Sequence, residues 1–347
     1  MAGRRVLITG VSTKLGAQLA LRLEADPDVA HLYGMDQMPP TAPLERMEFI
    51  EADIREPDIM RILPETGVEV VVHNSILRRP RPGMSTQAAH DINVMGTLQL
   101  LTACEQTDSI EAIVVRGSAG IYGSEPAAPQ FFREDMARLY ASRTRFQRDV
   151  SEIETYFENY ARRRPGVICT MLRYQPAIGT SLNTQVTRYL AMPVLPTYLG
   201  FDPRLQFVHE IDGLEALVAA IKNPVRGAVN VASRGTIGLT RMVRMSKKPA
   251  VPLPPQLFGG AVDAGARLGL DRLSDDFKRL LRYGRGVDLT RLAKEVGFTP
   301  RYTNVEAVAE YLAALRGEPI DPSAVGPTGP VPRPEPAASA EEEVPAS

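Results

Sequence analysis

Short apolar runs alternate with amphipathic segments along the first half of the chain. Runs of mainly branched apolar residues predict strands at 6–9, 29–35, 47–50, 68–72, 110–115 and 167–172. Apolar residues at helical spacing predict helices at 15–24, 59–63, 92–104 and 134–164. Strands that alternate with helices form a parallel sheet covered on both faces. The pattern therefore predicts an α/β fold with a doubly wound parallel sheet.

After about residue 180 this regular alternation is lost. Prolines interrupt it at Pro193, Pro196 and Pro203, and the stretch Pro249–Pro255 is interpreted as a proline-rich hinge. Shorter elements are predicted at 212–221, 228–232, 276–282, 290–296 and 304–315. We therefore expect a nucleotide-binding domain at 1–180 and a smaller substrate lobe at 181–316, with elements that interleave.

The last segment, 317–347, has a different composition. It holds eight prolines, six acidic residues and one basic residue, Arg333, with few large apolar side chains. Such a segment cannot bury enough apolar surface to offset the entropy lost on ordering. It is predicted to be a disordered acidic tail.

Composition excludes several classes of protein. The 347 residues include 40 Lys and Arg against 41 Asp and Glu, so the net charge of −1 does not favour nucleic acid as a partner. The two cysteines form no CxxC pair and the four histidines have no metal-ligand spacing, so no metal site is predicted. No apolar run is long enough to span a bilayer, and a cytoplasmic protein is expected.

A glycine-containing turn joins the first predicted strand to the first helix. Gly10 and Gly16 flank it, at the point where a dinucleotide pyrophosphate meets backbone N–H groups and a helix N-terminus. Asp36 ends the second predicted strand, where a carboxylate binds the ribose hydroxyls of adenosine. That carboxylate would repel the 2′-phosphate of NADP, so the predicted cofactor is NAD.

Several ordered blocks between about residues 4 and 315 together resemble the extended short-chain dehydrogenases/reductases of the NAD-dependent epimerase/dehydratase type. The blocks are Thr9-Gly10…Gly16, Asp53-Ile54, Val72–Ser75, Asn93–Thr97, Gly117–Gly123 and Leu172–Tyr174, with matches at Phe207–His209 and Asp288–Phe298 further on. The resemblance implies a Rossmann-like domain with NAD and a homodimer formed through the 134–164 helix. The expected cofactor-binding residues are Gly10, Thr13, Lys14, Leu15, Gly16, Asp36, Asp53, Ile54, Asn74 and Asn93.

In the family that this chain resembles, a Tyr moves the proton and a Lys four residues on lowers the pKa of that Tyr, while a Ser polarises the substrate oxygen. Ser118 falls at the Ser position. Tyr140-Ala-Ser-Arg-Thr144 is the closest match to Tyr-x-x-x-Lys, and a second register puts Thr144 at the Tyr position and Arg148 at the Lys position. The chain has no lysine between Lys14 and Lys222, so neither register recovers the pair.

Arginine is the remaining cation near the expected catalytic residue. Arg143 and Arg148 lie on the predicted helix and could lower the pKa of Tyr140 by charge alone. The expected catalytic residues are therefore Ser118, Tyr140, Arg143 and Arg148. Thr13 replaces the middle glycine of the turn, and Pro176 replaces the Asn that often touches a nucleotide-sugar phosphate. Gln175 and Arg204 are candidates for substrate binding.

Three functions remain open. The first is an epimerase/dehydratase-type oxidoreductase that transfers hydride with bound NAD on a sugar-nucleotide-like substrate. The second is a dinucleotide-binding sensor or scaffold that keeps the fold and has lost redox chemistry, which the missing lysine and Pro176 favour. The third is a reductase or isomerase of a lipid-like alcohol, suggested by the apolar stretch Leu257–Leu270, which a core helix would explain equally well.

Overall fold

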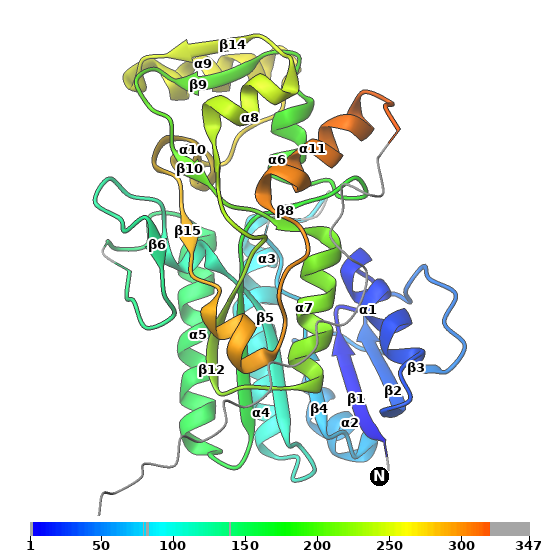
Figure 1. The fold of residues 1–347 in the computed structure, drawn as a ribbon. Coiled ribbons are helices and arrows are strands. Elements are labelled where there is room, and N and C mark those ends of the chain that lie inside the picture. The colour runs from blue at the N-terminus through cyan, green and yellow to red at the C-terminus, as the bar shows by residue number, and fades with distance from the viewer. Residues whose placement is uncertain (1–2, 79, 81–82, 139, 320–347) are drawn as a thin grey trace, which may run out of the picture.

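A parallel sheet forms the centre of the N-terminal domain (Figure 1). The computed structural model describes residues 3–78, 80, 83–138 and 140–319. Within these ranges seven strands pair in parallel, in the spatial order β12 (Gly227–Val231), β7 (Ile168–Tyr174), β5 (Ala112–Ser118), β4 (Val70–His73), β1 (Arg4–Thr9), β2 (Val29–Asp36) and β3 (Met47–Glu51). The order reverses direction at β1, which makes the sheet doubly wound.

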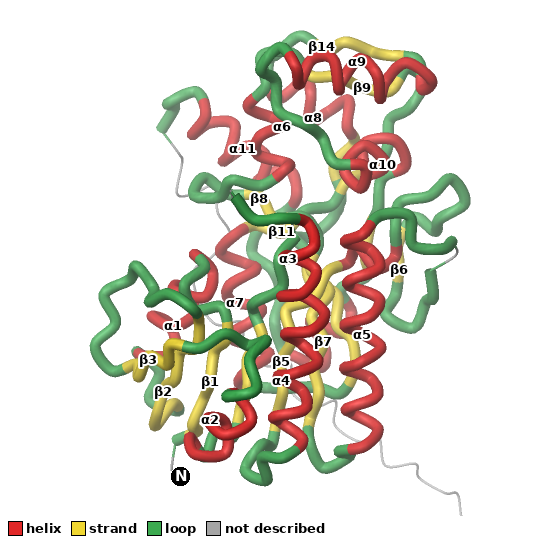
Figure 2. The backbone as a smooth tube through the Cα atoms, turned by 180° about the vertical axis from the view of Figure 1, so that it is seen from behind, coloured by secondary structure: helices red, strands yellow, loops and turns green. Residues whose placement is uncertain are grey.

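Helices cover both faces of this sheet (Figures 1 and 2). On one face α1 (Lys14–Glu24) and α7 (Glu210–Lys222) pack on apolar residues of β1, β4, β5 and β7. On the other face lie α2 (Ile59–Thr66), α4 (Gly96–Glu105) and α5 (Arg145–Arg163). The helix α3 (Thr86–His90) and a π-helical turn (Asp91–Met95) lead into α4. The predicted Rossmann-like α/β fold is confirmed.

A second, smaller core belongs to the C-terminal lobe. Its helices are α6 (Gln185–Ala191), α8 (Leu239–Ser246), α9 (Pro255–Arg267), α10 (Asp275–Tyr283) and α11 (Asn304–Leu315). Its short strands are β9 (Leu195–Tyr198), β10 (Arg204–Leu205), β13 (Ile237–Gly238) and β14 (Ala250–Leu253). Two-residue pairs lie near the junction between the lobes, namely β8 (Ala177–Ile178) with β11 (Val208–His209) and β6 (Phe131–Phe132) with β15 (Gly286–Val287).

The proline-rich hinge expected at 249–255 is wrong. Residues Ala250–Leu253 form β14, which pairs in parallel with β9, and Pro255 starts α9. Pro252 is tolerated because β14 has a neighbour on one side only. The acidic tail expected at 317–347 lies outside the described residues from position 320 onward.

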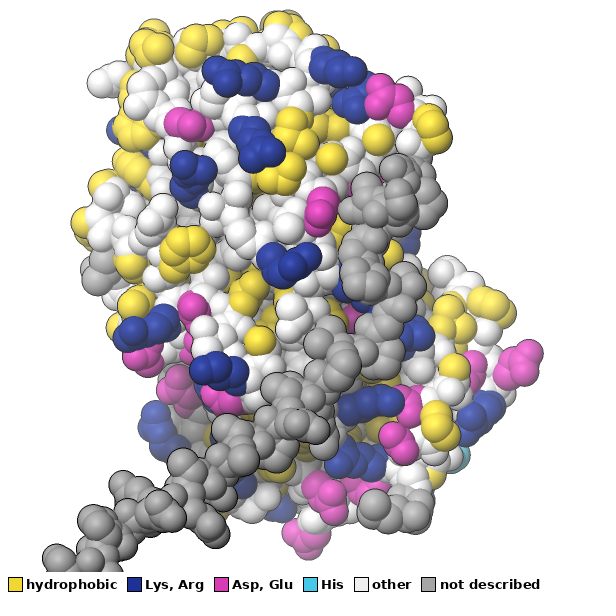
Figure 3. Space-filling view, viewed as in Figure 1, with side chains coloured by type: hydrophobic (Ala, Val, Ile, Leu, Met, Phe, Trp, Pro, Cys, Tyr) yellow, Lys and Arg dark blue, Asp and Glu magenta, His cyan; other side chains and the backbone are white. Residues whose placement is uncertain are grey.

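The apolar stretch Leu257–Leu270 is not a core helix. Its helix α9 buries only Phe258 and Val262, whereas Leu257 is 62% exposed and Leu268 is 87% exposed. Figure 3 accordingly shows hydrophobic side chains next to basic ones on the surface of the C-terminal lobe, at the top of the view. The stretch therefore does not line an interior site for an apolar substrate.

The helix expected from residue 134 begins only at Arg145. Thr144 is its N-cap: Thr144 Oγ1 accepts a hydrogen bond from Gln147 N at 3.2 Å, and Gln147 Oε1 accepts one from Thr144 N at 3.4 Å. This reciprocal capping box satisfies two backbone donors and fixes the start of the helix. The prediction was wrong because residues 134–143 include helix-favouring types such as Glu134, Met136 and Ala141, whereas the capping residue Thr144 sets the start of the helix.

A buried ion pair fastens α5 to the sheet. Arg173 of β7 donates to Glu154 of α5 through Nε at 3.0 Å and through Nη2 at 2.6 Å, and both side chains are at most 10% exposed. The Nη1 group of Arg173 also donates to Tyr122 Oη at 2.8 Å, and Tyr122 Oη donates to Asn230 Oδ1 at 2.9 Å. The network joins α5, β7, β12 and the turn that follows β5.

We expect Glu154→Gln to destabilise the fold by about 3 kcal/mol, because it leaves the Arg173 guanidinium buried without its counter-ion. Urea unfolding of the full chain measures this change. Glu65→Gln is the matched control, since its partner Arg61 lies on the surface of α2 and an exposed pair contributes less than about 0.5 kcal/mol. Equal stability of the two variants would contradict the role given to the buried pair.

Candidate functional site

The turn between β1 and α1 is the most sterically constrained part of the site. Gly10 has φ +72°, and a Cβ on Gly16 would lie 2.9 Å from Val11 Cα and even closer to the Gly10 carbonyl oxygen. Both positions therefore require glycine, one for its backbone conformation and one for the approach of α1 to the turn. The two glycines therefore keep the turn tight at the N-terminus of α1, which is where a pyrophosphate meets backbone N–H groups.

Thr13, which replaces the middle glycine, is held inside this turn. Its Oγ1 donates to Gly10 O at 2.8 Å and accepts from Gly16 N at 3.1 Å, so the side chain acts as the N-cap of α1. Asn74 Nδ2 donates to the same Oγ1 at 3.0 Å. Asn74 Oδ1 is buried and has no hydrogen-bond partner among the described residues, so it is an acceptor available to a bound ligand.

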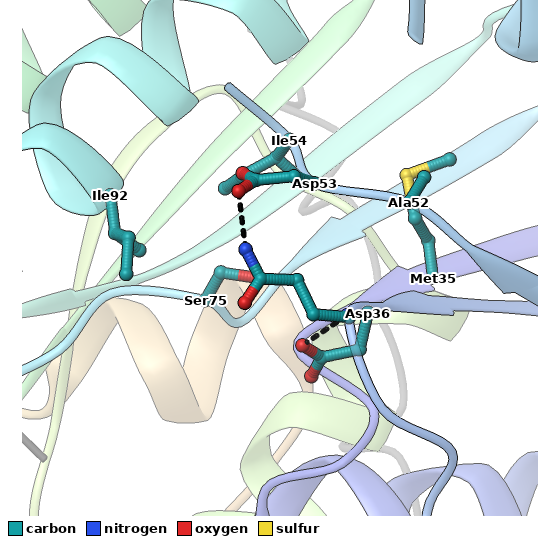
Figure 4. Close-up of a pocket in the computed structure, with 8 residues that line it drawn as sticks. Met35, Asp36, Ala52, Asp53, Ile54, Ser75 and Ile92 are labelled. Atoms are coloured by element: carbon teal, nitrogen blue, oxygen red, sulfur yellow. Dashed lines mark hydrogen bonds between the residues drawn. The ribbon is translucent and has the colours of Figure 1, made fainter. Parts of the chain in front are cut away.

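Two carboxylates face one pocket at the ends of β2 and β3 (Figure 4). Asp36 accepts from Ser12 N at 3.1 Å and from Ser12 Oγ at 2.5 Å, which ties it to the β1–α1 turn. Asp53 accepts from Arg55 Nε at 2.9 Å, and this hydrogen-bonded cation holds the pKa of Asp53 low despite its partial burial. Buried Ile54 and half-buried Ile92 add apolar surface to the pocket. Carboxylates beside an apolar wall suit an adenosine.

The other expected cofactor residues mostly contact protein. Lys14 Nζ donates to Ser181 O at 2.8 Å, across to the C-terminal lobe, and Leu15 packs on the core under α1. Asn93 Nδ2 donates to Leu77 O at 2.9 Å and to Asp149 Oδ2 at 3.2 Å. Asn93 thereby holds the loop after β4 against α5, and it acts on the cofactor site only through that loop.

A buried histidine, His73 at the end of β4, joins the end of β1 to α4. His73 Nδ1 lies 2.8 Å from Thr9 Oγ1, and Nε2 lies 2.9 Å from Thr97 Oγ1. Burial lowers the pKa of His73 to about 4, so the ring is neutral at physiological pH.

Ser118 ends β5 and is buried beside the N-terminal part of α5. Its Oγ and the ring of Phe146 lie 3.1 Å and 3.4 Å, respectively, from the position that a Cβ on Gly120 would take. Phe146, Val150 and Glu154 follow one another at four-residue spacing and so share one face of α5. Phe146 and buried Val150 are therefore the two residues of α5, four positions apart, that lie toward Ser118. Neither side chain can transfer a proton.

The pairing of Tyr140 with Arg143 or Arg148 on one helix is wrong, because Tyr140 and Arg143 both precede the Thr144 cap. Arg143 Nε instead lies 3.5 Å from Glu125 Oε1. Arg148 is on α5 but exposed, two residues away from Phe146 and from Val150 and so on the opposite side of the helix. In the described part of the chain Tyr140 makes no hydrogen bond to Ser118.

The two expected substrate residues lie near the junction of the lobes. Gln175 follows β7 and is buried, and its Oε1 accepts from Arg285 Nε at 3.2 Å. Arg204 lies on β10 with an exposed side chain, while its carbonyl accepts from Arg285 N at 3.2 Å. Both residues therefore support Arg285, which no motif in the sequence singled out.

Comparisons with known proteins agree with this geometry. Residues 6–232 match the model of the NAD dependent epimerase/dehydratase family. The chain belongs to this family. An uncharacterised protein of Mycobacterium tuberculosis, Rv0501, is 35% identical over 324 residues, which cover 91% of this chain and 85% of that protein. NAD, the predicted cofactor, is thereby confirmed.

Solved structures share the fold of this epimerase/dehydratase chain at low identity. MoeE5 in complex with UDP-glucose and NAD has a TM-score of 0.68 and 19% identity, covering 90% of this chain and 99% of that one. UDP-glucuronic acid 4-epimerase of Bacillus cereus in complex with NAD has a TM-score of 0.65 and 17% identity, with the same coverage. None of the helices in the described ranges has the length and apolar character that a membrane crossing requires.

Sequence reasoning missed Phe146 because it looked for a Tyr and a Lys. A usable signal was present: Glu154 is the acid that pairs with Arg173 of the Leu-Arg-Tyr strand, and counting back by four residues from Glu154 reaches Val150 and Phe146. The helix also carries Glu152 and Glu158, and the ion pair in the structure identifies Glu154 as the partner of Arg173.

We expect Asp36→Asn to weaken NAD binding by about 10-fold, because a charged acceptor for ribose hydroxyls becomes neutral. The amide can still accept from Ser12, so the turn should stay folded. Titration of NAD and NADP into apo protein measures the effect, and NADP should lose less affinity than NAD. Asp28→Asn, an exposed change at the opposite end of β2 from Asp36, should leave both affinities unchanged.

We expect His73 to make stability fall as the pH drops from about 6.5 toward 4. The unfolded chain takes up a proton near pH 6.5, whereas folded His73 resists it down to about pH 4. The contribution to the unfolding free energy between pH 7 and pH 5 is about 1–2 kcal/mol. Urea unfolding at these pH values should show a smaller difference for His73→Gln than for the wild type; equal differences would mean that His73 is charged in the folded state.

Proposed function

We propose that this protein is an NAD-dependent oxidoreductase of the epimerase/dehydratase type that acts on a nucleotide-sugar-like substrate. The observation that carries the proposal is the order of groups along the carboxyl edge of the sheet. Asp36 lies at β2, the Gly10–Gly16 turn at β1 and Ser118 at β5, all at strand ends. Ligands of open α/β sheets bind along this edge, near the point where the strand order reverses.

Each group has a part in that binding mode. Asp36 accepts from the ribose hydroxyls, and Asp53 and Ile54 line the adenosine pocket. The Gly10–Gly16 turn offers backbone N–H groups to the pyrophosphate, and Asn74 Oδ1 is a buried acceptor for a hydroxyl or N–H donor of the ligand. Bound NAD supplies the hydride acceptor and donor. Ser118 donates a hydrogen bond to the oxygen on the reacting carbon of the substrate.

The substrate class is supported by the solved relatives and by the second lobe. MoeE5 is described in complex with UDP-glucose, and the Bacillus cereus relative is a UDP-glucuronic acid 4-epimerase. In this chain the buried Gln175–Arg285 pair lies where β7 meets the C-terminal lobe, on the same side as Ser118. A polar pair there suits a hydroxylated ligand better than an apolar one.

A second candidate is an NAD-binding sensor or scaffold without redox turnover. The specific observation in its favour is Phe146 beside Ser118 with Val150 one helical turn further on. Proton transfer by a positioned acid or base contributes about 10²–10⁴-fold to such reactions. A chain that lacks the Tyr and Lys of its family at these positions must use another group or do without the reaction.

One experiment separates the two candidates. Full-length protein loaded with NAD is mixed with UDP-glucose or UDP-glucuronic acid, while absorbance at 340 nm reports NADH and NMR reports sugar products. For the oxidoreductase we expect turnover that Ser118→Ala lowers by about 100-fold, as when a hydrogen-bond donor to the developing charge is lost. Phe146→Tyr should raise it by about 10-fold or more, because a phenol returns beside Ser118.

Thermal unfolding and NAD titration of each variant show whether the fold and the cofactor site are retained. Arg148→Gln is the control, since this exposed side chain points away from Ser118. No turnover in the wild type and in Phe146→Tyr, with NAD and nucleotide-sugar binding intact, would establish the sensor or scaffold instead.

A further inference from the structure

Arginines from four separate segments surround the turn that carries Ser118. They are Arg78 after β4, Arg116 on β5, Arg138 before α5 and Arg285 before β15; these four are called the arginine cluster. Three come from the N-terminal domain and Arg285 comes from the C-terminal part of the chain. The cluster is therefore assembled only when the two lobes meet.

Arg138 and Arg285 converge on Gly123, which ends the Ser118 turn. Arg285 is 7% exposed and its Nη1 donates to Gly123 O at 3.4 Å. Arg138 Nη2 lies 2.7 Å from the position of a Cβ on Gly123, and Nη1 donates to Ser142 Oγ at 3.2 Å. A Cβ at residue 123 would displace the Arg138 guanidinium, so glycine makes room for Arg138 beside the carbonyl that Arg285 contacts.

Arg116 and Arg78 approach the same turn from its other sides. Arg116 precedes Ser118 by two residues on β5, which places both on the same face of the strand. Its guanidinium carbon lies 5.5 Å from the ring centre of Tyr174, the residue paired with Ser118 across β5 and β7. The guanidinium carbon of Arg78 lies 5.6 Å from the ring centre of Phe146.

Positive charge exceeds negative charge at this place. Burial lowers the pKa of Arg116, Arg138 and Arg285, and repulsion between Arg78 and its neighbours Arg116 and Arg285 lowers the pKa of Arg78 and of Arg285. Asp276 of α10 is the carboxylate that faces Arg78, Arg138 and Arg285, and it accepts from Thr144 Oγ1 at 2.8 Å and Gln147 Nε2 at 2.5 Å.

The other carboxylate beside the cluster, Glu125, is shared with further arginines. Arg143 lies 3.5 Å from it and Arg279 is hydrogen-bonded to it. Among the described residues, Asp276 faces Arg78, Arg138 and Arg285, and Glu125 faces Arg138, Arg143 and Arg279. Arg116, the sixth cation, lies beside Tyr174. The six cations are not neutralised by these two acids.

Two guanidinium groups of the cluster, those of Arg116 and Arg138, also have N–H groups without acceptors. Arg116 Nε and both Nε and Nη2 of Arg138 are buried without a hydrogen-bond partner in the described part of the chain. A buried donor that is left unpaired is unfavourable, more so when it carries charge. Unpaired N–H groups and surplus positive charge at one place are the features of an oxyanion site.

The phosphates of NAD do not fill this site. The Gly10–Gly16 turn lies at the end of β1, and β5 is two strands away in the order β5-β4-β1. Neighbouring strands are about 4.8 Å apart, so roughly 10 Å separates the turn from Arg116 along the edge of the sheet. The cluster faces the reacting end of the substrate, where Ser118 lies.

We infer that the sugar of the substrate carries a carboxylate on the carbon that adjoins the reacting carbon. The arginine cluster binds that carboxylate. The inference rests on the nucleotide-sugar substrate proposed above and narrows it to acidic sugars. Asp276, the carboxylate near Arg78, Arg138 and Arg285, is hydrogen-bonded to the cap of α5 instead of to these guanidinium groups. The planar fork of each guanidinium matches the two oxygens of a carboxylate.

The test compares UDP-glucuronic acid with UDP-glucose, which differ only in a carboxylate against a hydroxymethyl group. Calorimetric titration into full-length, NAD-loaded protein at 0.15 M salt gives both dissociation constants, with free UDP as a third ligand. We expect UDP-glucuronic acid to bind at least about 10-fold more tightly than UDP-glucose, since charge-assisted hydrogen bonds contribute that much or more.

Two variants locate the effect. The variants are Arg78→Gln, at an exposed side chain, and Arg116→Gln, at a half-buried one. Each should reduce the preference for UDP-glucuronic acid over UDP-glucose to about 3-fold or less. The affinities for UDP-glucose and for UDP should stay within about 2-fold of those of the wild type. Arg61→Gln, in an exposed ion pair on α2, is the control that should change none of the three constants.

Two results would overturn the inference while leaving the proposed function in place. One is equal affinity of the wild type for UDP-glucuronic acid and UDP-glucose. The other is an equal loss for UDP, UDP-glucose and UDP-glucuronic acid in the variants, which would assign the cluster to the diphosphate. Binding of NAD without binding of any of the three ligands would instead refute the nucleotide-sugar substrate, and the inference with it.

Discussion

The buried ion pair between Arg173 and Glu154 determines which side of α5 meets the rest of the molecule. A helix packed on a sheet can rotate about its axis or slide along it, and apolar contacts alone distinguish poorly between such positions. A charged pair sealed in the interior does distinguish them, because any other position leaves two charges unpaired at a cost of several kcal/mol. Once Glu154 is fixed, Val150 and Phe146 follow at the helical spacing of four residues, and Phe146 comes to lie by Ser118.

The two halves of the site keep the residue pattern of the family to different degrees. The cofactor half depends on backbone geometry: Gly16 must lack a Cβ, and Thr13 can replace a glycine because its hydroxyl bonds back to Gly10 and caps α1. The reaction half depends on side-chain chemistry, and there nothing in the packing demands a phenol. A phenylalanine fills the same space beside Gly120, so the fold is kept whether or not the proton-transfer group is present.

The sequence predicted the alternating strands and helices, and it predicted features that depend on residues close together in the chain. Strands 6–9 and 110–115 and the glycine turn were readable because apolar alternation and backbone strain are expressed within a few residues. The start of α5 was not readable, since Thr144 matched a Tyr position in one register and serves as a helix cap in the structure. The arginine cluster was not readable either, because its members lie as far apart as 78 and 285 and only the meeting of the lobes brings them together. The domain boundary at residue 180, inferred from the loss of regular alternation, and the disordered tail at 317–347, inferred from composition, remain predictions.

Asp276 of α10 connects the arginine cluster beside Ser118 to the position of the C-terminal lobe. It reaches from α10 to the cap of α5, through Thr144 and Gln147, while it also faces three of the clustered arginines. A carboxylate has a limited number of acceptor positions, so hydrogen bonds given to the cap are not available to the guanidinium groups. A second carboxylate brought by the substrate would take up those unpaired N–H groups without displacing Asp276 from the cap. Binding of an acidic ligand would then strengthen the junction between the lobes, because it removes repulsion among the cations that the junction brings together.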